Sequence, residues 1–204
     1  LKVVWVQTAQ KETYKGNNVT DSDYPNDYIQ TITGGTVTKG ASNKTQWSIA
    51  SYLARAQYSY KGKYILSAAI RADGSSRFGK NNRWGYFPSA SAAWRISDEE
   101  FFRKSEALSF IGDAKLRASY GVTGNFQIGN YDHLSLMAID NYILGTGNGQ
   151  LANGYKPDNI KNEDLSWEKN AMVNIGLDIK MFKGLFGVSV DFYDTNTTDM
   201  LLNV

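Results

Sequence analysis

The chain has 204 residues, of which 42% are hydrophobic and 13% aromatic, and its 22 basic and 20 acidic residues leave a net charge of +2. Because these charges are mixed along the sequence, no basic stripe is offered to a nucleic acid, and none is expected as a partner. The absence of cysteine excludes disulfides, a thiol nucleophile and cysteine metal sites. No run approaches the roughly 18 consecutive apolar residues of a membrane helix, so the protein is either soluble or meets a membrane in another way.

The first regular strand pattern lies at Tyr52–Tyr60, after a weaker one at Lys2–Thr8. One parity of Tyr52–Tyr60 is apolar with a tyrosine at each end, and the other is mostly polar, which predicts a strand between two different surroundings. After the short turn 61–63 the pattern resumes at Tyr64–Asp73, so the two segments are predicted to form a tight hairpin. The second segment has ten residues. This is close to the roughly 9 to 11 that a tilted strand needs to cross the hydrocarbon layer of a bilayer.

The remaining strands follow the same two-faced pattern, with the charged residues on one parity. They are predicted at residues 89–96, 115–123, 171–180 and 186–193. The connections alternate between tight turns and long polar loops, at residues 61–63 and 183–184 and at residues 74–83 and 124–165 respectively. This alternation is typical of an outer-membrane barrel with short periplasmic turns and long outer loops. We therefore predict an all-β fold, a curved antiparallel meander that pairs successive strands and places charged residues on its concave side.

One connection differs from this scheme, because residues 97–113 are too long for a periplasmic turn. The segment opens with "SDEE", in which Ser97 and Glu100 have the spacing of a capping box, before several apolar residues. This predicts a short helix near residues 98–105 at the periplasmic rim. The acidic cluster from Asp98 to Glu100 is explained by the preference of a helix start for negative charge rather than by acid/base chemistry, so no enzymatic activity is expected.

The alternation has a second explanation, a secreted soluble β-domain that binds or degrades glycans. In such a domain the residues of the apolar parity form the core of a sandwich or barrel, and those of the polar parity face water. The two hypotheses differ in where the apolar residues point, into a closed core or outward as a band about 25 Å tall. The residues that decide between them are Ala68, Ile70, Ala92, Val173 and Ile175.

Three segments carry a family resemblance: "RADGSSRFG", "FPSASAAWR" and "RASYGVTGN". Together with the surrounding sequence from about Trp47 to the last residue, they resemble the barrel of SusC/RagA transporters, a TonB-dependent outer-membrane family. The resemblance implies a 22-stranded barrel holding an N-terminal plug, a SusD-like surface lipoprotein as a lid, and outer-membrane lipid around the wall. It also implies import of oligosaccharides, or in some members peptides, driven through TonB.

Residues 1–204 show neither the plug nor the TonB-contacting segment of that family. Only about seven strands can be counted, fewer than the eight of the smallest known bacterial barrels. We therefore expect residues 1–204 to be part of the barrel domain of a longer protein in the outer membrane of a Bacteroidetes-like Gram-negative bacterium.

The long connection 124–165 is the predicted recognition element, because loops beyond about 12 to 15 residues are usually functional or disordered. It mixes aromatic residues with asparagines, and such flat apolar faces and amides can hold a sugar. The alternative is that it packs against other loops or against the lid protein. The residues "DGSS" in the loop 74–83 are first of all typical of a turn. Trp84, where the chain returns from this loop to the next strand, is also a candidate for the aromatic belt at the membrane interface. A single histidine gives neither a zinc site nor a triad, so no metal or cofactor is expected. The candidate substrate-binding residues are Arg77, Trp84, Tyr131, His133, Tyr142 and Tyr155.

Overall fold

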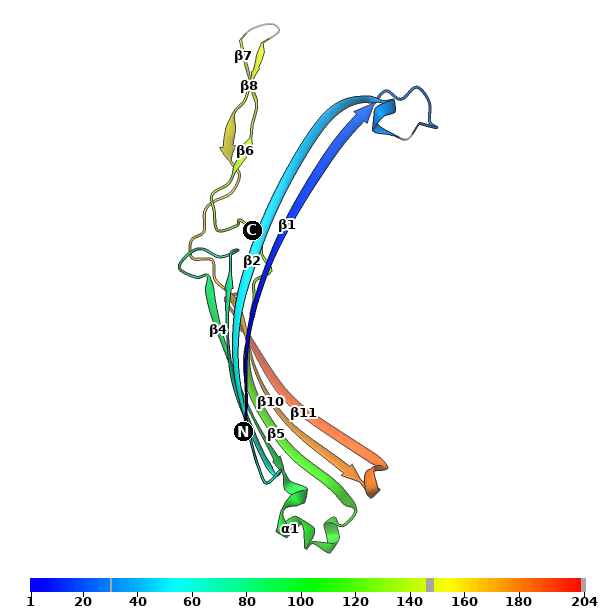
Figure 1. The fold of residues 1–204 in the computed structure, drawn as a ribbon, viewed down its shortest axis with the longest axis vertical. Helices are drawn as coiled ribbons and strands as arrows, with labels where there is room; N and C mark the ends of the chain where they lie inside the picture. Colours follow the sequence, from blue (N-terminus) through cyan, green and yellow to red (C-terminus); the bar gives the residue numbers. More distant parts are fainter. Residues whose placement is uncertain (30, 146–148, 203–204) are drawn as a thin grey trace.

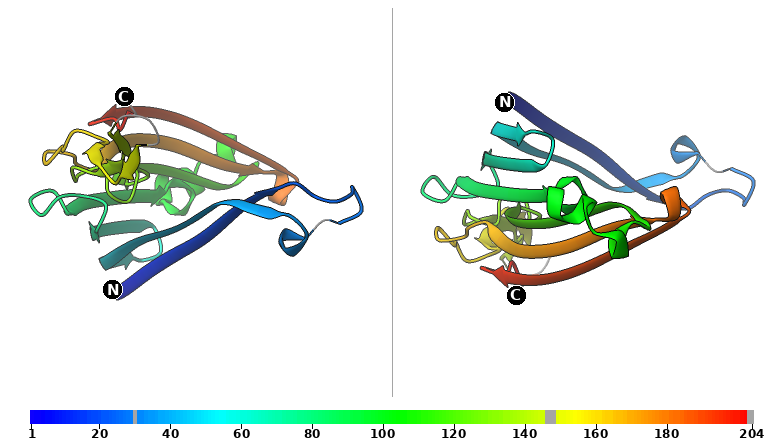
Figure 2. Two further views of the ribbon diagram at one scale, coloured as in Figure 1. Left: turned by 90° about the horizontal axis from the view of Figure 1, so that it is seen from above. Right: turned by 90° about the horizontal axis from the view of Figure 1, so that it is seen from below.

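The computed structural model describes residues 1–29, 31–145 and 149–202. In this part of the chain, seven strands form one antiparallel sheet in the order β1-β2-β3-β4-β5-β10-β11. The sheet curves into a trough whose two edges are β1 and β11, as Figures 1 and 2 show. The predicted meander is therefore confirmed. The strands are β1 (Lys2–Ser22), β2 (Thr36–Tyr60), β3 (Tyr64–Ser75), β4 (Trp84–Arg95), β5 (Ile111–Asn125), β10 (Glu168–Met181) and β11 (Phe186–Thr198).

The hairpin between β2 and β3 shows how local sequence sets the register. Tyr60 pairs with Tyr64, and the Lys63 N–H donates a hydrogen bond to the Tyr60 carbonyl oxygen at 3.0 Å. Lys61 and Gly62 between them have φ of 50° and 69°. Two successive positive φ angles are the signature of a type I′ turn, whose twist matches that of the flanking strands. The predicted tight turn is therefore present, and it fixes every pairing up to Ile49 with Ser75.

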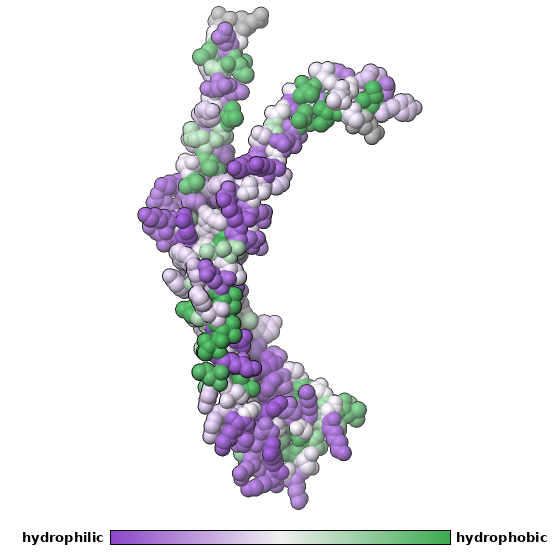
Figure 3. All heavy atoms as spheres, viewed as in Figure 1, coloured by the Kyte–Doolittle hydropathy of each residue, from purple (hydrophilic) through white to green (hydrophobic). Residues whose placement is uncertain are grey.

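Alternation sorts the side chains of the sheet onto two faces, which differ in polarity as predicted. The polar face carries the parity of Arg55, Arg71 and Arg117, and it lies on the concave side because the hydrophobic residues of the other parity gather on the convex side in Figure 3. The apolar face lies on the convex side, where hydrophobic residues gather at mid-height between hydrophilic regions above and below (Figure 3). Its side chains are not covered by the described chain: Leu66 is 53% and Ile70 51% exposed. The deciding residues Ala68, Ile70, Ala92, Val173 and Ile175 are all exposed on this face, so they form no closed core.

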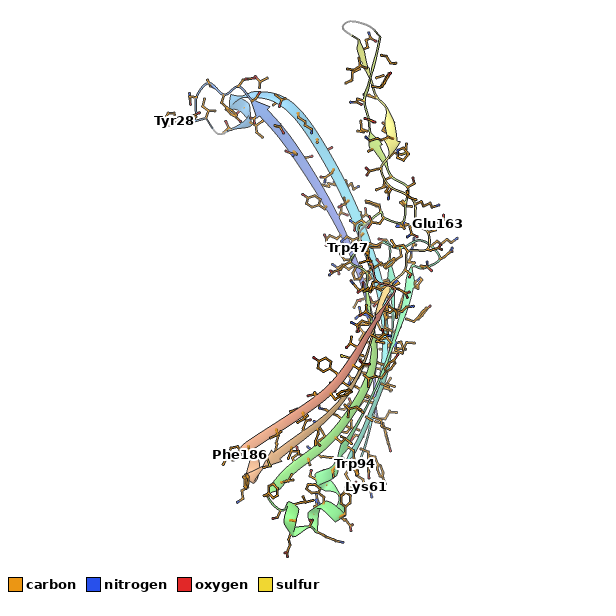
Figure 4. The ribbon with its side chains drawn as sticks, turned by 180° about the vertical axis from the view of Figure 1, so that it is seen from behind. Tyr28, Trp47, Lys61, Trp94, Glu163 and Phe186 are labelled. Carbon is orange, nitrogen blue, oxygen red and sulfur yellow. The ribbon has the colours of Figure 1, made fainter. Side chains whose placement is uncertain are left out.

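Aromatic residues mark both ends of the apolar face. At the end with the short turns, the rings of Tyr60, Tyr64 and Trp94 form a stacked row with 6.4 Å between successive centroids. At the end with the long loops, Tyr52 stacks on Trp84 at 6.0 Å. Tyr52 and Tyr60 are eight residues apart on β2, so the two aromatic rows are separated by about 26 Å along the strand. Figure 4 shows Lys61, Trp94 and Phe186 at the short-turn end and Trp47 and Glu163 toward the long-loop end.

The strands are staggered across the sheet, as closure of a barrel requires. Following the pairing from Tyr60 through β3, β4, β5 and β10 leads to Val190 on β11. Yet β11 begins four residues earlier, at Phe186, whose ring contacts Phe182 of the adjoining turn at 6.0 Å. Neighbouring strands therefore shift steadily along their length, which is the geometry of tilted strands in a wall.

Two segments extend beyond the sheet at the long-loop end. The ribbon of β1 and β2 continues past the last residue of β3 and ends near the short η1 (Ile32–Gly34), which is drawn in blue in Figure 1. The connection 126–167 also rises as a long hairpin, so this predicted loop contains strands of its own. Its strands are β6 (Met137–Ile139) paired with β9 (Tyr155–Pro157) and β7 (Tyr142–Leu144) paired with β8 (Gln150–Ala152).

The predicted rim helix is present and short. The connection from β4 to β5 contains η2 (Ile96–Asp98), α1 (Glu100–Arg103) and η3 (Glu106–Leu108), and η4 (Phe182–Gly184) lies at the turn before β11. The predicted capping box is wrong, because the cap of α1 is Glu99 and makes no side-chain hydrogen bond. The Ser97 hydroxyl instead donates to Asp113 Oδ1 at 3.2 Å, since this serine is buried against the start of β5. Within the described ranges, no helix has both the length and the hydrophobicity to cross a membrane.

Candidate functional site

The candidate site lies on the polar face at the long-loop end, where the β3–β4 loop meets the connection after β5. Phe78 and Trp167 are almost fully buried there, and their ring centroids are 5.0 Å apart. Phe87 of β4 packs edge-on against Trp167 at 5.4 Å. The Trp167 indole N–H donates to the Arg83 carbonyl oxygen at 3.1 Å, so its polar atom is satisfied. This aromatic cluster fixes both loops to the wall. Phe78 and Trp167 are isolated aromatic residues in otherwise polar loops. This pattern could have indicated the cluster, but the predictions from sequence did not use it.

Arg77 is held between two aromatic rings beside this cluster. Its guanidinium lies 4.8 Å from the ring centroid of Trp47 and 5.3 Å from that of Phe126, which are cation–π distances. It also donates to Asn130 Oδ1 at 2.9 Å and to the Phe126 carbonyl oxygen at 3.3 Å. Arg77 thus joins β2, its own loop and the long connection. These contacts already use several of its donors within the chain.

Tyr131 and His133 lie close to this junction. The Tyr131 hydroxyl accepts a hydrogen bond from the Gln46 N–H at 2.9 Å, which ties the long connection to β2. His133 lines a hollow of about 410 Å³ together with Lys80 and Glu163. Its Nδ1 is buried and has no hydrogen-bond partner among the residues that the structure describes. The structure therefore brings Arg77, Tyr131 and His133 to one region.

The other three candidates lie elsewhere. Trp84 is on the apolar face, stacked on Tyr52, and a Cβ atom on Gly74 would come within 2.8 Å of its ring. It belongs to the aromatic row at the long-loop end of the sheet. Tyr142 and Tyr155 lie on the projecting hairpin and are 66% and 68% exposed. Their rings are accessible from solution, while Trp84 faces away from the concave side.

Below this region the polar face carries a network of paired charges. The Arg117 guanidinium donates to Asp191 at 2.7 Å and to Asp178 at 3.2 Å, and Lys115 lies 3.0 Å from Asp178. Farther up, Arg71 pairs with Asp73 at 2.8 Å. The pairs of Lys115 and Arg117 link β5, β10 and β11 across the concave side, and together with the Arg71 pair within β3 they give the wall a charged, hydrogen-bonding lining. Within the described ranges, no group of three or more His, Asp or Glu residues is placed to hold a metal ion.

At the short-turn end, Glu99 joins three elements. Its carboxylate accepts hydrogen bonds from the Tyr64 hydroxyl at 2.6 Å, the Trp94 indole N–H at 3.2 Å and Lys63 Nζ at 3.1 Å. These bonds, with that from Tyr64 the largest contribution, lower the pKa of Glu99 to about 2. The carboxylate is thus kept ionised, and it fixes the rim segment to the β2–β3 turn and to the end of β4.

Comparison with known proteins agrees with this geometry. A family model described as the β-barrel of TonB-dependent receptor-like proteins matches residues 4–204, which extends the match toward the N-terminus beyond Trp47. "TonB-dependent receptor P39" of Formosa agariphila is 39% identical over 200 residues, covering 97% of this chain and 18% of that protein. "TonB-dependent receptor SusC" of Bacteroides thetaiotaomicron is 36% identical over 161 residues, covering 78% of this chain and 16% of that protein.

Among solved structures, that of the RagAB peptide transporter superimposes with a TM-score of 0.82 at 30% identity. The match covers 99% of this chain and 22% of that one. The chain thus spans about a fifth of the length of the proteins that it matches. A sheet with an exposed apolar convex face, a charged concave face and staggered strands is what a segment of a barrel wall requires. The chain therefore belongs to the β-barrel family of TonB-dependent receptors and is of the SusC/RagA type.

Proposed function

We propose that residues 1–204 form part of the barrel domain of a TonB-dependent outer-membrane transporter. The whole protein imports oligosaccharides or peptides together with a SusD-like surface lipoprotein, and TonB acts through a region outside this segment. It performs transport and no catalytic step. The relatives named as TonB-dependent receptors and the likeness to the RagAB peptide transporter support this proposal.

The observation that carries the proposal is the apolar face. Its residues are exposed along successive strands between two aromatic rows that lie about 26 Å apart along the strand. With strands tilted by about 35 to 45°, this is a height of roughly 20 Å, comparable with the apolar band of about 25 Å of outer-membrane barrels. A secreted glycan-binding domain would instead bury this parity against a second layer. Val173 and Ile175 are 42% and 48% exposed, which favours the transporter over that alternative.

Fractionation of the cell envelope tests this proposal. The full-length protein should remain in the membrane pellet after high-salt and carbonate washes and should dissolve only in detergent, because exposed apolar strands need a hydrocarbon surrounding. A soluble periplasmic protein and a known outer-membrane porin serve as controls in the same preparation. Recovery of the protein in the aqueous wash would reject the membrane assignment.

Recognition is assigned to the outer loops, where Arg77, Tyr131 and His133 gather and where Tyr142 and Tyr155 are exposed. Aromatic rings beside amides and charged groups suit both sugars and peptides. The hairpin tip also exposes aliphatic side chains, with Ile143 65% and Leu151 64% exposed. Such a surface equally fits packing against the lid protein, so the role of the tyrosines has to be tested directly.

The test compares two variants with the wild type in the full-length transporter. The double substitution Tyr131→Ala with Tyr142→Ala should weaken ligand binding about 30-fold if each ring contributes roughly 1 kcal/mol of contact. Tyr131→Phe removes only the hydroxyl that accepts from Gln46, so it separates anchoring of the loop from contact with the ligand. Barrel assembly is monitored by the heat-dependent shift in gel mobility. Unchanged affinity in a correctly inserted double variant would assign these residues to packing alone.

A further inference from the structure

A polar hollow lies on the ribbon that β1 and β2 form beyond the sheet. Gly16 pairs with Asn43 there, in the same unshifted register that pairs Val4 with Arg55. Gly16, Asn43 and Tyr14, two residues before Gly16, therefore have the parity of the polar face. Figure 1 shows that the ribbon bends toward the concave side of the sheet. Residues of this parity thus face the space above the charged lining.

Small residues form the floor of the hollow, and larger polar residues form its walls. Gly16 and Ala41 leave a volume of about 370 Å³ beside Tyr14, Asn18 and Asn43. A Cβ atom on Gly16 would come within 3.1 Å of the Tyr14 hydroxyl oxygen and would collide with Asn43 Oδ1. Glycine therefore lets the tyrosine and the amide lie close together over the strand. The volume is at the lower end of the range of about 300 to 1,000 Å³ for small-molecule sites, so it fits a short part of a chain molecule.

The groups in this hollow are uncharged and available for binding. None of the residues that line it is charged, because the nearest charged side chains of this parity along the ribbon, Glu12 and Lys39, lie outside it. The Tyr14 side chain is 58% exposed, and none of the ring pairs among the described residues includes it. Within the part of the chain that the structure describes, the side-chain amides of Asn18 and Asn43 make no hydrogen bond.

This combination of groups matches the chemistry of a neutral sugar. An amide both donates and accepts hydrogen bonds, as sugar hydroxyls do. The C–H face of a sugar ring is apolar and packs on a flat aromatic ring, whose face carries partial negative charge. A charged ligand would find no opposite charge among the lining residues. An extended peptide binds a sheet through unpaired backbone groups at its edge, whereas this hollow lies over the face of paired strands.

We propose that Tyr14, Asn18 and Asn43 form a subsite for a neutral sugar unit of an oligosaccharide. The subsite lies on the ribbon, apart from the candidate residues in the loops after β3 and β5. The inference rests on the proposed function and deepens it, because it selects oligosaccharides over peptides as the class of substrate.

Isothermal titration of the full-length transporter in detergent tests this subsite. The neutral probes are hexasaccharides of glucose, galactose, mannose and xylose, and hexagalacturonate and a pool of uncharged decapeptides represent the other ligand classes. At least one neutral hexasaccharide should bind to the wild type. Tyr14→Ala should weaken that binding about tenfold, because the contact with the ring is lost. Tyr14→Phe keeps the ring and should retain most of the affinity.

A matched control is available in the connection between the same two strands. Tyr28 is 95% exposed and lies outside the hollow, so Tyr28→Ala should leave the affinity unchanged. Gly16→Ala keeps every side chain that is proposed to bind but fills the hollow, so it should weaken binding about as much as Tyr14→Ala. This variant should also assemble, because alanine is less unfavourable than glycine inside a strand. Assembly is monitored by the heat-dependent shift in gel mobility.

Absence of binding by every neutral hexasaccharide would overturn the proposal, as would equal affinities of the Tyr14→Ala and Tyr28→Ala variants. Binding of hexagalacturonate or of the decapeptides that is lost in Tyr14→Ala would also overturn it, because the hollow would then take another class of ligand. Membrane insertion is measured separately by the carbonate wash. Protein in the aqueous fraction rejects the transporter, whereas an inserted protein with equal affinities in the two variants rejects only this subsite.

Discussion

Glu99 is an example of a single side chain that holds several elements in place. Three donors from the β2–β3 turn, the start of β3 and the end of β4 converge on its carboxylate. The sequence predicted that the acidic cluster from Asp98 to Glu100 marks the start of a helix. The location is correct, because α1 begins at Glu100, but Glu99 serves to link strands rather than to cap the helix with its side chain. Two of its three partners, Tyr64 and Lys63, lie 35 and 36 residues away in the chain, so only the folded register brings them to Glu99.

Glu99→Gln should therefore loosen the short-turn end at neutral pH. A carboxylate whose pKa is lowered from 4.5 to about 2 stabilises the fold above pH 4.5, and this contribution disappears as the pH falls through about 2. Hydrogen exchange should become faster at the Lys63 and Arg95 amides in the variant, and the difference from the wild type should vanish near pH 2. Glu100→Gln is the control, because its exposed pair with Lys104 should contribute little. Equal exchange at neutral pH would show that Glu99 does not join these elements.

At the scale of elements, the hairpins with strict alternation were predictable and the polar extensions were not. The turn at residues 61–63 and the pairing of its strands follow from periodicity and turn residues alone. By contrast, only Lys2–Thr8 of β1 showed a strand pattern, whereas the strand continues to Ser22. Beyond Thr8 both parities are polar, so no apolar alternation reveals the strand. It is defined by backbone pairing with β2, whose polar first half was missed for the same reason.

The aromatic cluster around Phe78 was also missed, and it yields a prediction for the β3–β4 loop. Phe78 is fully buried, so Phe78→Ala should destabilise the local structure by about 3 to 5 kcal/mol through the lost contacts and the cavity left behind. Limited proteolysis should then cut within residues 76–83 in the variant, whereas this loop should stay intact in the wild type. Phe101→Ala, at a site 61% exposed on α1, is the control and should not alter cleavage there. An intact loop in the Phe78 variant would mean that hydrogen bonds alone hold it.

For the whole molecule, the separation of the two faces determines where the protein can reside. The sheet leaves large apolar side chains exposed on its convex side and pairs Lys115 and Arg117 with Asp178 and Asp191 on the concave side. This separation was predictable from parity, because a period of two assigns each residue of a strand to a face. The ribbon was not predictable, since both parities of β1 are polar beyond Thr8, and the strands of the projecting hairpin have only three residues each, too few for alternation to reveal them.

Adjacent alanines on opposite faces provide the most direct test of this separation. Ala68 lies on the apolar face and pairs with Ala56, midway between Tyr52 and Tyr60, whereas Ala69 lies on the polar face and pairs with Arg55. Arginine at the middle of the lipid-facing surface costs about 2 to 4 kcal/mol, because its charge enters hydrocarbon. Ala68→Arg should therefore lower the unfolding free energy of the full-length barrel in lipid vesicles by about that amount, measured by urea titration. Ala69→Arg places the same side chain in the lining and should cost less than about 1 kcal/mol, although it adds a like charge opposite Arg55. Equal costs at the two positions, or a larger cost at Ala69, would mean that the convex face does not lie in lipid.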